Sequence, residues 1–480
     1  MALRRPLTVS AGICALVWGA AGLGGLAPVL AAPAVAAPAV AAPAVAAPAV
    51  LISPAALHIR SAAPTPPTTA YCEQHYKIAC YEPGQVQQAY NLPPLLHRGI
   101  DGAGQTIVIV DSFGSPTIAH DLSVFDRTFG LPAPPSLKVI QPAGKVAPYT
   151  PTATREGWAG ETNLDVEYAH VMAPGAKILL VETPTSEEEG TTGFPQIVKA
   201  EEYVIDHHLG GVISQSFSAT EQTFPSQQSL RRLRGAYIDA ARKGVTVLAA
   251  SGDSGAGDVR YNEVDYYLSR VTSWSDSDPL VTGVGGTQLH LNAAGEHIAP
   301  DSVWNDTYNV PANEFIVGDA GPNPLAGGGG KSVVFSRPRY QDGVAGVVGP
   351  RRGVPDIAMS GACNGAVDSY QSFPGQSAGW YPTCGTSEAT PLFSGVVALA
   401  DQVAGHPLGL INPALYALSA SHARGITDVR NGNNTVSFTQ GGKLDTVKGF
   451  TARAGYDLAS GVGTVDADPF VFELAGLAGR

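Results

Sequence analysis

Short apolar runs alternate with amphipathic stretches along the chain after residue 105. The runs that are rich in Val, Ile and Leu predict β-strands at residues 106–110, 178–181, 212–216, 245–250 and 281–284. Most contain no polar residue, which indicates strands that are buried on both faces. Helices are predicted between them at residues 197–208 and 227–242. In the second helix the apolar residues recur every three or four positions, at Leu230, Leu233, Tyr237 and Ala241.

This order of elements predicts an α/β fold. Strands that alternate with helices form a mainly parallel sheet with helices on both faces, and active residues gather at the carboxyl ends of the strands. Beyond the N-terminal region the sequence shows no internal repeat and no second break in composition. We therefore expect one large domain over residues 69–480.

The first 68 residues have a different pattern. Arg4 and Arg5 precede an apolar stretch at residues 7–30, which is typical of a secretory signal peptide, expected over residues 1–32. An uncleaved anchor is the alternative, because the stretch is long enough to cross a bilayer. Residues 31–50 are four copies of Ala-Ala-Pro-Ala-Val. We expect residues 33–68 to form a disordered spacer, because such sequences offer little patterned apolar surface.

Composition excludes several classes of function. The chain has 29 Lys and Arg against 41 Asp and Glu, a formal net charge of −12, so it offers no basic surface for nucleic acid. A hydrophobic content of 44% argues against a disordered chain. Only the N-terminus has a long apolar run, so a polytopic membrane protein is excluded and the mature form has no membrane span.

The cysteines are consistent with export. Cys14 lies within the expected signal peptide, which leaves an even number of cysteines for the mature chain, at Cys72, Cys80, Cys363 and Cys384. Four cysteines allow three pairings. The local pairs 72–80 and 363–384 are preferred, and free buried thiols are the alternative.

Ser387 has the setting of a nucleophile. Residues 385–391 are Gly-Thr-Ser-Glu-Ala-Thr-Pro and precede the apolar stretch at residues 392–400, which predicts a buried helix. A hydroxyl at the start of a helix lies near unpaired N–H groups and the positive end of the helix dipole, and both favour a developing oxyanion. A simple capping serine is the alternative.

A serine nucleophile needs a base, and the 11 histidines offer none in a suitable setting. His170, His207 and His208 lie in helical segments without nearby glycines. Glu161 and Asp165 instead lie four residues apart on a predicted helix, so their carboxyl groups share one face. Two such carboxyls resist joint ionisation and can share one proton. A solvated acidic helix face is the alternative.

A third acid, Asp253, follows the predicted strand at residues 245–250 in the sequence Ser-Gly-Asp-Ser-Gly. The carboxyl end of a strand is where active sites of this architecture form. A turn in which Asp253 caps the next segment is the alternative.

Together these motifs resemble those of the sedolisins, the serine-carboxyl peptidases, which have a subtilisin-like fold and use Glu in place of a His base. The resemblance covers about residues 70–470 and includes further runs at residues 105–111, 173–177, 212–216 and 354–358. It implies an endopeptidase that cleaves polypeptides at acid pH. We expect a monomer that is secreted or associated with the cell envelope.

The resemblance also implies the roles of four residues. Ser387 is similar to the nucleophile and Glu161 to the general base and acid. Asp165 matches the residue that orients Glu161, and Asp253 matches the oxyanion-hole donor.

One structural calcium ion is implied near the C-terminus. The matching ligands are the carboxylates of Asp428 and Asp457 and the backbone carbonyls of Val429, Arg453 and Gly455. Carboxylates combined with carbonyls suit a hard cation. Arg453 stands where the family usually has glycine, but only its carbonyl would bind. Two ordinary loop aspartates are the alternative.

Sedolisins are typically made with a long folded pro-segment. Here only the spacer at residues 33–68 separates the expected signal peptide from the region of resemblance. We therefore expect this chain to lack the usual pro-domain. Unaided folding, a chaperone on another chain and an incomplete reading frame all stay open.

Two other functions also stay open. A catalytically silent binding or envelope protein would have the same fold but would not react with an active-site-directed aldehyde or fluorophosphonate. A conventional Ser-His-Asp hydrolase, using Asp111 and an unrecognised His, would become more active toward neutral pH.

Overall fold

The computed structural model describes residues 57–59 and 62–478 of the 480-residue chain. The expected signal peptide, Cys14 and spacer residues 33–56 lie outside the described residues. Within the described part, no helix combines the length and the apolar character needed to cross a membrane.

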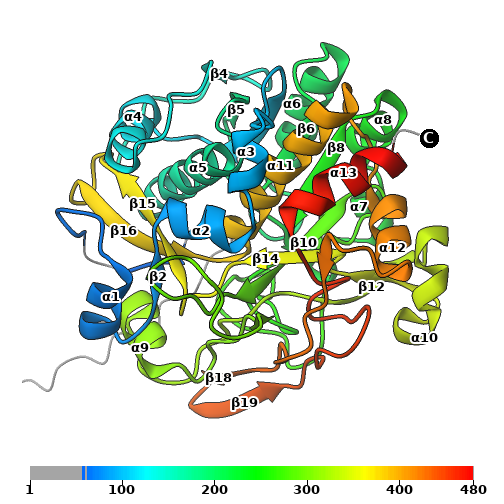
Figure 1. Cartoon of the computed structure of the whole chain (residues 1–480). Coiled ribbons are helices and arrows are strands. Elements are labelled where there is room, and N and C mark those ends of the chain that lie inside the picture. The colour runs from blue at the N-terminus through cyan, green and yellow to red at the C-terminus, as the bar shows by residue number, and fades with distance from the viewer. Residues whose placement is uncertain (1–56, 60–61, 479–480) are drawn as a thin grey trace, which may run out of the picture. The chain divides into compact units, whose positions relative to one another are not determined.

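An eight-stranded sheet lies at the centre of the structure (Figure 1). The strand order is β11-β10-β8-β6-β3-β5-β4, and β14 also pairs with β10. All neighbours are parallel except β10 and β11, so the expected mainly parallel sheet is confirmed. Its strands are β3 (Thr106–Ser112), β4 (Leu137–Ile140), β5 (Lys177–Thr183), β6 (Val212–Gln215), β8 (Thr246–Ala250), β10 (Thr282–Gln288), β11 (Ser302–Val303) and β14 (Ile357–Ser360).

Helices cover both faces of this sheet, as predicted. Alternate residues of β3 point to opposite faces, with Ile107 and Ile109 in one apolar core and Val108 and Val110 in another. Helices α5 (Ala153–Met172) and α11 (Thr386–Ala404) pack together on the first face, and α6 (Phe194–Asp206) and α8 (Gly235–Lys243) lie on the second. Strands buried on both faces explain the unbroken apolar runs.

The remaining elements surround this centre. The other helices are α1 (Thr69–His75), α2 (Pro83–Ala89), α3 (Pro93–His97), α4 (Ile118–Phe129), α7 (Gln227–Arg231), α9 (Val310–Ala312), α10 (Ala345–Val348), α12 (Asn412–Ala420) and α13 (Ala467–Ala478). The other strands are β1 (Leu57–His58), β2 (Cys80–Tyr81), β7 (Ala219–Thr220), β9 (Ser273–Trp274), β12 (Gly330–Ser336), β13 (Arg351–Val354), β15 (Ala366–Gln371), β16 (Gly379–Cys384), β17 (Ile426–Thr427), β18 (Val436–Gln440), β19 (Lys443–Val447) and β20 (Thr464–Val465).

The prediction of one helix over residues 227–242 is wrong, because the chain there forms α7 and then α8. The guanidinium of Arg234 turns to the buried carboxyl of Asp278, with Nη2 2.8 Å from Oδ1. The next helix starts at Gly235, where a Cβ would lie 2.4 Å from the Glu202 carboxyl of α6. A long-range ion pair and a close helix approach therefore interrupt the periodic segment.

A second sheet has the order β1-β16-β15-β2. In it β1 runs antiparallel to β16, with Leu57 opposite Cys384. Leu57 and Ile59 are buried, and Ala63 exchanges backbone hydrogen bonds with Trp380. The spacer prediction is therefore wrong for residues 57–59 and Ala63, because this stretch has the large apolar side chains that the Ala-Pro repeats lack.

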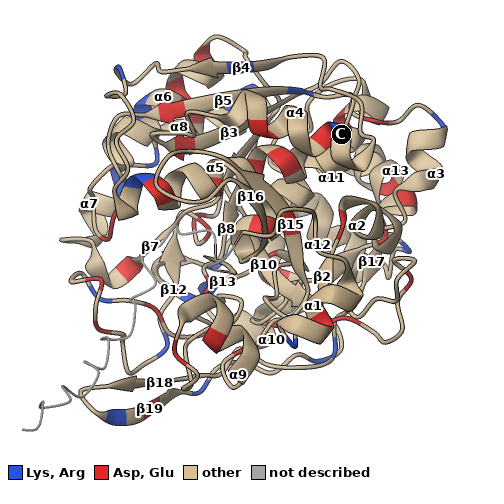
Figure 2. Cartoon of the chain, turned by 90° about the vertical axis from the view of Figure 1, so that its left-hand side faces the viewer, with Lys and Arg blue, Asp and Glu red and all other residues tan. Residues whose placement is uncertain are grey.

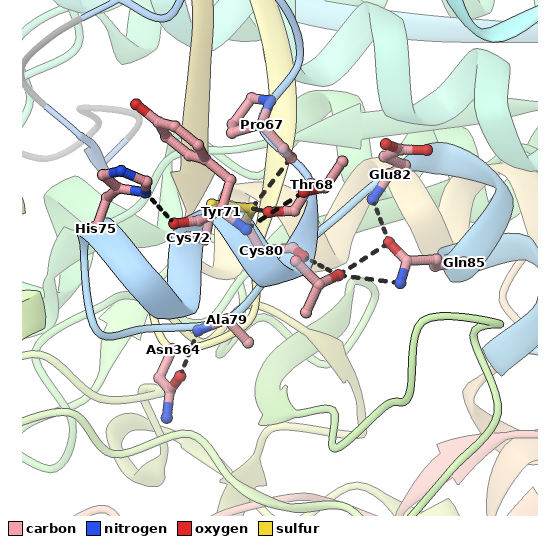
Figure 3. The surroundings of a disulfide bond; sticks show 11 residues. Pro67, Thr68, Tyr71, Cys72, His75, Ala79, Cys80, Glu82, Gln85 and Asn364 are labelled. Atoms are coloured by element: carbon pink, nitrogen blue, oxygen red, sulfur yellow. Dashed lines mark hydrogen bonds between the residues drawn. A yellow bond between two sulfur atoms is a disulfide. The ribbon is translucent and has the colours of Figure 1, made fainter.

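Both preferred disulfides are present. Cys72–Cys80 joins α1 to β2 (Figure 3), and Cys363–Cys384 joins the segment after β14 to the end of β16. All four cysteines are 0% exposed. Each bond therefore lies inside the apolar cluster that the second sheet covers.

Many acids are buried without a cationic partner. Figure 2 shows Asp and Glu in red and the fewer Lys and Arg in blue. Among the described residues Arg352 is the only buried Lys or Arg, and it pairs with Asp356. Burial raises the pKa of Glu167, Asp276 and Asp368 well above the ordinary values.

Raised carboxyl pKa values make stability depend on pH. A buried acid keeps its proton in the folded state above the pH at which the unfolded chain releases it. The folded state is then favoured below the ordinary pKa and loses stability as pH rises toward the folded pKa. We expect the protein to be most stable in acid.

The substitution Glu201→Gln tests whether a buried acid lowers stability as pH rises. Burial raises the pKa of Glu201 to about 8, and the Gln215 amide donates to its carboxyl group. The neutral amide removes the penalty of ionisation, so the free energy of unfolding should rise by roughly 3 kcal/mol at pH 7 and stay unchanged at pH 4. Urea unfolding at the two pH values measures this free energy of unfolding. The exposed control Glu73→Gln should change neither value, and an equal gain for Glu201→Gln at both pH values would contradict the argument.

Candidate active site

The structure places Ser387 at the N-terminal end of α11, as predicted. Strand β16 ends at Cys384, Gly385 caps the helix, and Ser387 is its second residue. Gly385 has φ 126°, and a Cβ there would lie 2.6 Å from Asp253 Oδ2. Only glycine allows this approach. Ser387 is 5% exposed, so its hydroxyl lies near the unpaired N–H groups of the first helical turn in a largely dry setting.

Glu161 comes to Ser387 from the neighbouring helix. It lies in the middle of α5, where every residue from Trp158 to Met172 is buried. Burial raises the pKa of Glu161 well above its ordinary value, and the charges of Asp111 and Asp253 raise it further. The hydroxyls of Ser387 and Ser216 lie near enough to lower this pKa. The contact is loose, since neither carboxyl oxygen of Glu161 has a formed hydrogen bond among the described residues. Catalytic hydrogen bonds often tighten only when substrate binds.

Asp165 lies one helical turn further along α5, on the same face as Glu161. The Ser216 hydroxyl donates to Asp165 Oδ1 at 2.8 Å. Burial raises the pKa of Asp165 well above its ordinary value, and the nearby charges of Asp111 and Glu161 add to the effect. Ser216 therefore lies between the two carboxyl groups of the predicted pair.

Asp253 contacts Thr386, the residue before Ser387. Its Oδ1 accepts hydrogen bonds from the Thr386 N–H and hydroxyl, both at 2.7 Å. Burial raises the pKa of Asp253 to about 6, the two bonds from Thr386 oppose this, and the charge of Asp258 adds to it. Asp253 is therefore neutral in acid and able to donate a hydrogen bond beside Ser387.

Sequence analysis missed two buried acids of this region as members of the site. Asp111 ends the apolar part of β3, and burial raises its pKa to about 7. It belongs to the acid cluster of Glu161 and Asp165 rather than to a histidine. Glu388 follows Ser387 directly, and burial raises its pKa well above the ordinary value. An acid at the end of an apolar strand was the signal for Asp111.

Among the described residues, the three histidines considered as a base for Ser387 are bonded elsewhere or exposed. His170 is buried on α5, where its Nε2 lies 2.7 Å from the Pro132 carbonyl oxygen and burial lowers its pKa to about 4. His207 and His208 are exposed. In the described part of the chain, no histidine is among the main influences on the pKa values of Glu161 and Asp253.

The residues expected to bind calcium lie together. The Gly455 N–H donates to Asp428 Oδ2 at 3.1 Å, and the Arg453 N–H donates to Asp457 Oδ2 at 2.9 Å. Asp428 Oδ1 is buried without a partner, which leaves an oxygen suited to a cation. Arg430 competes for Asp428 through an ion pair at 2.7 Å. Residues 57–59 and 62–478 hold no group of three or more His, Cys, Asp and Glu arranged for a metal. A cation would therefore need the backbone carbonyls.

Comparison with known proteins gives the family. The model of the subtilase family matches residues 157–441. The chain belongs to the subtilase family, and its similarities place it among the sedolisins. Kumamolisin from Bacillus sp. (strain MN-32) is 31% identical over 391 residues, which are 80% of this chain and 62% of kumamolisin. Sedolisin from Pseudomonas sp. (strain 101) is 28% identical over 365 residues, 76% of this chain and 57% of that protein. Tripeptidyl-peptidase 1 from Homo sapiens is 28% identical over 361 residues, 72% and 55% of the two chains.

A solved structure shows the same fold. Pseudomonas sedolisin, a serine-carboxyl proteinase complexed with two molecules of pseudo-iodotyrostatin, superposes with a TM-score of 0.68 at 24% identity. The match covers 84% of this chain and 99% of that one. The subtilisin-like fold is therefore confirmed. This chain spans less than two thirds of the length of the curated relatives.

The charge of Asp258 offers a test of the Asp253 environment. The substitution Asp258→Asn removes a negative charge that favours protonated Asp253, so the pKa of Asp253 should fall by about one unit or less. The protonated-carboxyl stretch in infrared spectra, assigned by difference against Asp253→Asn, reports this pKa in a Ser387→Ala background. Glu73→Gln serves as the distant control. A higher or unchanged pKa would show that Asp258 does not act on Asp253.

Proposed function

We propose that the chain is an exported serine-carboxyl endopeptidase that hydrolyses polypeptides at acid pH through an acyl-enzyme on Ser387. One observation carries the proposal. Two buried carboxyl groups lie at the start of α11, where Glu161 on α5 is close enough to the Ser387 hydroxyl for it to affect the Glu161 pKa and Asp253 after β8 bonds to Thr386. Similarity to kumamolisin and sedolisin supports the same conclusion.

Glu161 is the proposed general base and acid. The Ser387 oxygen attacks the peptide carbonyl carbon while Glu161 accepts the hydroxyl proton. Glu161 then passes this proton to the leaving amine, the C–N bond breaks, and an ester forms on Ser387. Water hydrolyses the ester by the reverse transfer, which returns the proton to Ser387. A carboxylate suffices because burial raises the pKa of Glu161 well above its ordinary value and so makes it a stronger base.

Asp253 is the proposed oxyanion-hole donor. The negative charge that develops on the carbonyl oxygen meets the N-terminal end of α11 and the proton of neutral Asp253. The two bonds from Thr386 hold one carboxyl oxygen, which leaves the other free to carry the proton. A neutral carboxylic acid in this position donates only while it stays protonated.

Asp165 orients Glu161 in this proposal. Its carboxyl accepts from Ser216, and the charges of Asp111, Glu161 and Asp165 oppose one another's ionisation. The first proton is therefore lost from the cluster of Asp111, Glu161 and Asp165 as a coupled set, and the nearby Ser387 hydroxyl favours its loss from Glu161. The acid limb of the activity profile reports this shared titration.

We further propose a structural calcium ion near the C-terminus. Asp428 and Asp457 would supply carboxylate oxygens, and Val429, Arg453 and Gly455 would supply carbonyl oxygens. The buried, unpartnered Oδ1 of Asp428 supports this assignment. A bound calcium ion would hold the loop at residues 453–457 against the segment that carries Asp428, and it would take no part in the chemistry.

Export and domain organisation belong to the same proposal. Two buried disulfides are typical of proteins from oxidising compartments, which supports secretion or envelope association. We propose a signal peptide at residues 1–32, a peptidase domain that begins near residue 57, and action as a monomer.

The pH dependence of peptide hydrolysis tests the proposal. Activity on a denatured protein substrate should rise with pH as the cluster of Asp111, Glu161 and Asp165 loses its first proton. It should fall above about pH 6 as Asp253 ionises. Mass spectrometry of the new termini separates internal cleavage from tripeptide removal, with Ser387→Ala as the inactive control. A profile that climbs through neutral pH would support the Ser-His-Asp alternative.

The substitution Asp253→Ala tests the oxyanion donor. Loss of one donor should reduce kcat by roughly 10²–10³-fold while the protein stays folded. The rate at the acid optimum and the circular dichroism melting curve report the two quantities. Full activity at acid pH would show that Asp253 is not the donor.

Calcium binding is measured by thermal unfolding. Added calcium at 100 times its Kd should stabilise the protein by about 2.7 kcal/mol, and a chelator should reverse the gain. The substitution Asp428→Ala should abolish this response, whereas Asp342→Asn, an exposed acid elsewhere, should retain it. A calcium response that survives Asp428→Ala would place the ion at another site.

A further inference from the structure

The turn before Ser387 is short and is held from two sides. It consists of Cys384, the last residue of β16, the cap residue Gly385, and Thr386, the first residue of α11. On one side Thr386 bonds to Asp253 through its N–H and hydroxyl, and the Gly252 N–H donates to the same hydroxyl at 3.2 Å. The position of this turn relative to Asp253 therefore fixes where nucleophile and oxyanion donor meet.

Residues 361–363 hold the turn from the other side. The Gly385 N–H donates to the Gly361 carbonyl at 2.9 Å. The N–H groups of Gly361 and Ala362 donate to the Thr287 carbonyl in β10, at 3.1 and 3.2 Å. A Cβ at Gly361 would lie 2.7 Å from the Gly385 carbonyl oxygen, so the two backbones touch. This contact connects the turn to the central sheet.

The Cys363–Cys384 disulfide adds a covalent tie at the same contact. Cys384 precedes Ser387 by three residues, and the Cα atoms of the two cysteines are 4.9 Å apart. A hydrogen bond can stretch, whereas this bond limits how far the turn can move from β14 and β10. We propose that the Cys363–Cys384 disulfide is a positioning element of the active site, which holds the nucleophile turn in register with the oxyanion donor. The proposal rests on the peptidase function proposed above.

The second disulfide provides a matched control. Cys72–Cys80 lies in the same apolar cluster and is equally buried. It joins α1 to β2, where Pro67 contacts Cys80 (Figure 3). The Thr69 hydroxyl also donates to the Cys80 carbonyl. The described contacts of this disulfide do not include the turn at residues 384–386. Removing it should cost stability without moving Ser387.

The experiment compares Cys363→Ala/Cys384→Ala with Cys72→Ala/Cys80→Ala at acid pH, at a temperature where both are folded. Kinetics on a peptide give kcat and KM. Affinity for a peptide aldehyde, which adds Ser387 across its carbonyl, is compared with affinity for the corresponding peptide alcohol. Because a displacement near 1 Å costs about 100-fold in rate, we expect kcat to fall by about 10- to 100-fold in the first variant, with KM nearly unchanged.

In the Cys363→Ala/Cys384→Ala variant, the affinity for the peptide aldehyde should fall in parallel with kcat, whereas the affinity for the peptide alcohol should stay unchanged. The Cys72→Ala/Cys80→Ala variant should melt at a lower temperature but keep kcat within about twofold. Equal kcat losses in both variants, or an unchanged kcat without Cys363–Cys384, would overturn the proposal.

The substitution Gly361→Ala tests the same position with both disulfides intact. The added methyl group pushes against the Gly385 carbonyl, so kcat should again fall while KM holds. This variant decides the matter if the first does not fold, since an unchanged kcat in it would also overturn the proposal. Wild-type reaction with the aldehyde, and its loss in Ser387→Ala, tests the peptidase function separately.

Discussion

Removal of carboxyl groups from water is the constraint on which this structure depends. Helix α5 packs against the central sheet and beside α11, so Glu161 and Asp165 lie in the core. The one buried Lys or Arg of the described residues already pairs with Asp356. With no cation beside them, these acids hold their protons at a pH where exposed carboxyls have lost theirs. The same burial that makes Glu161 a stronger base keeps Asp253 neutral.

Stability and chemistry are thereby tied to the same range of pH. Asp111 and Glu388 add further buried acids around Ser387, and acids outside the site, such as Glu201, titrate in the same direction. An environment that kept Asp253 protonated would also favour the folded state. The stability of the fold and the proposed mechanism therefore depend on pH in the same direction.

The sequence predicts well what depends on local pattern. Apolar runs located five of the eight strands of the sheet, β3, β5, β6, β8 and β10. Four-residue spacing placed Glu161 and Asp165 on one helical face, and a strand end placed Asp253. Contacts between segments far apart in the sequence were not predicted. Arg234, which precedes α8, pairs with Asp278, 44 residues further along the chain. Ser216 donates to Asp165, 51 residues before it. Pairing of β1 with β16 depends on Leu57 and Ile59 meeting a cluster that other segments build.

Labelling of Ser387 by a fluorophosphonate tests the central claim most directly, because it reports activation of the hydroxyl without a substrate. Labelling rates are measured across pH for the wild type and for Glu161→Gln, and mass spectrometry locates the modified residue. The comparison distinguishes a Glu161 base from a histidine base. The account predicts labelling of Ser387 in acid that is lost with Glu161→Gln. Labelling that persists in this variant and grows toward neutral pH would contradict a carboxylate base.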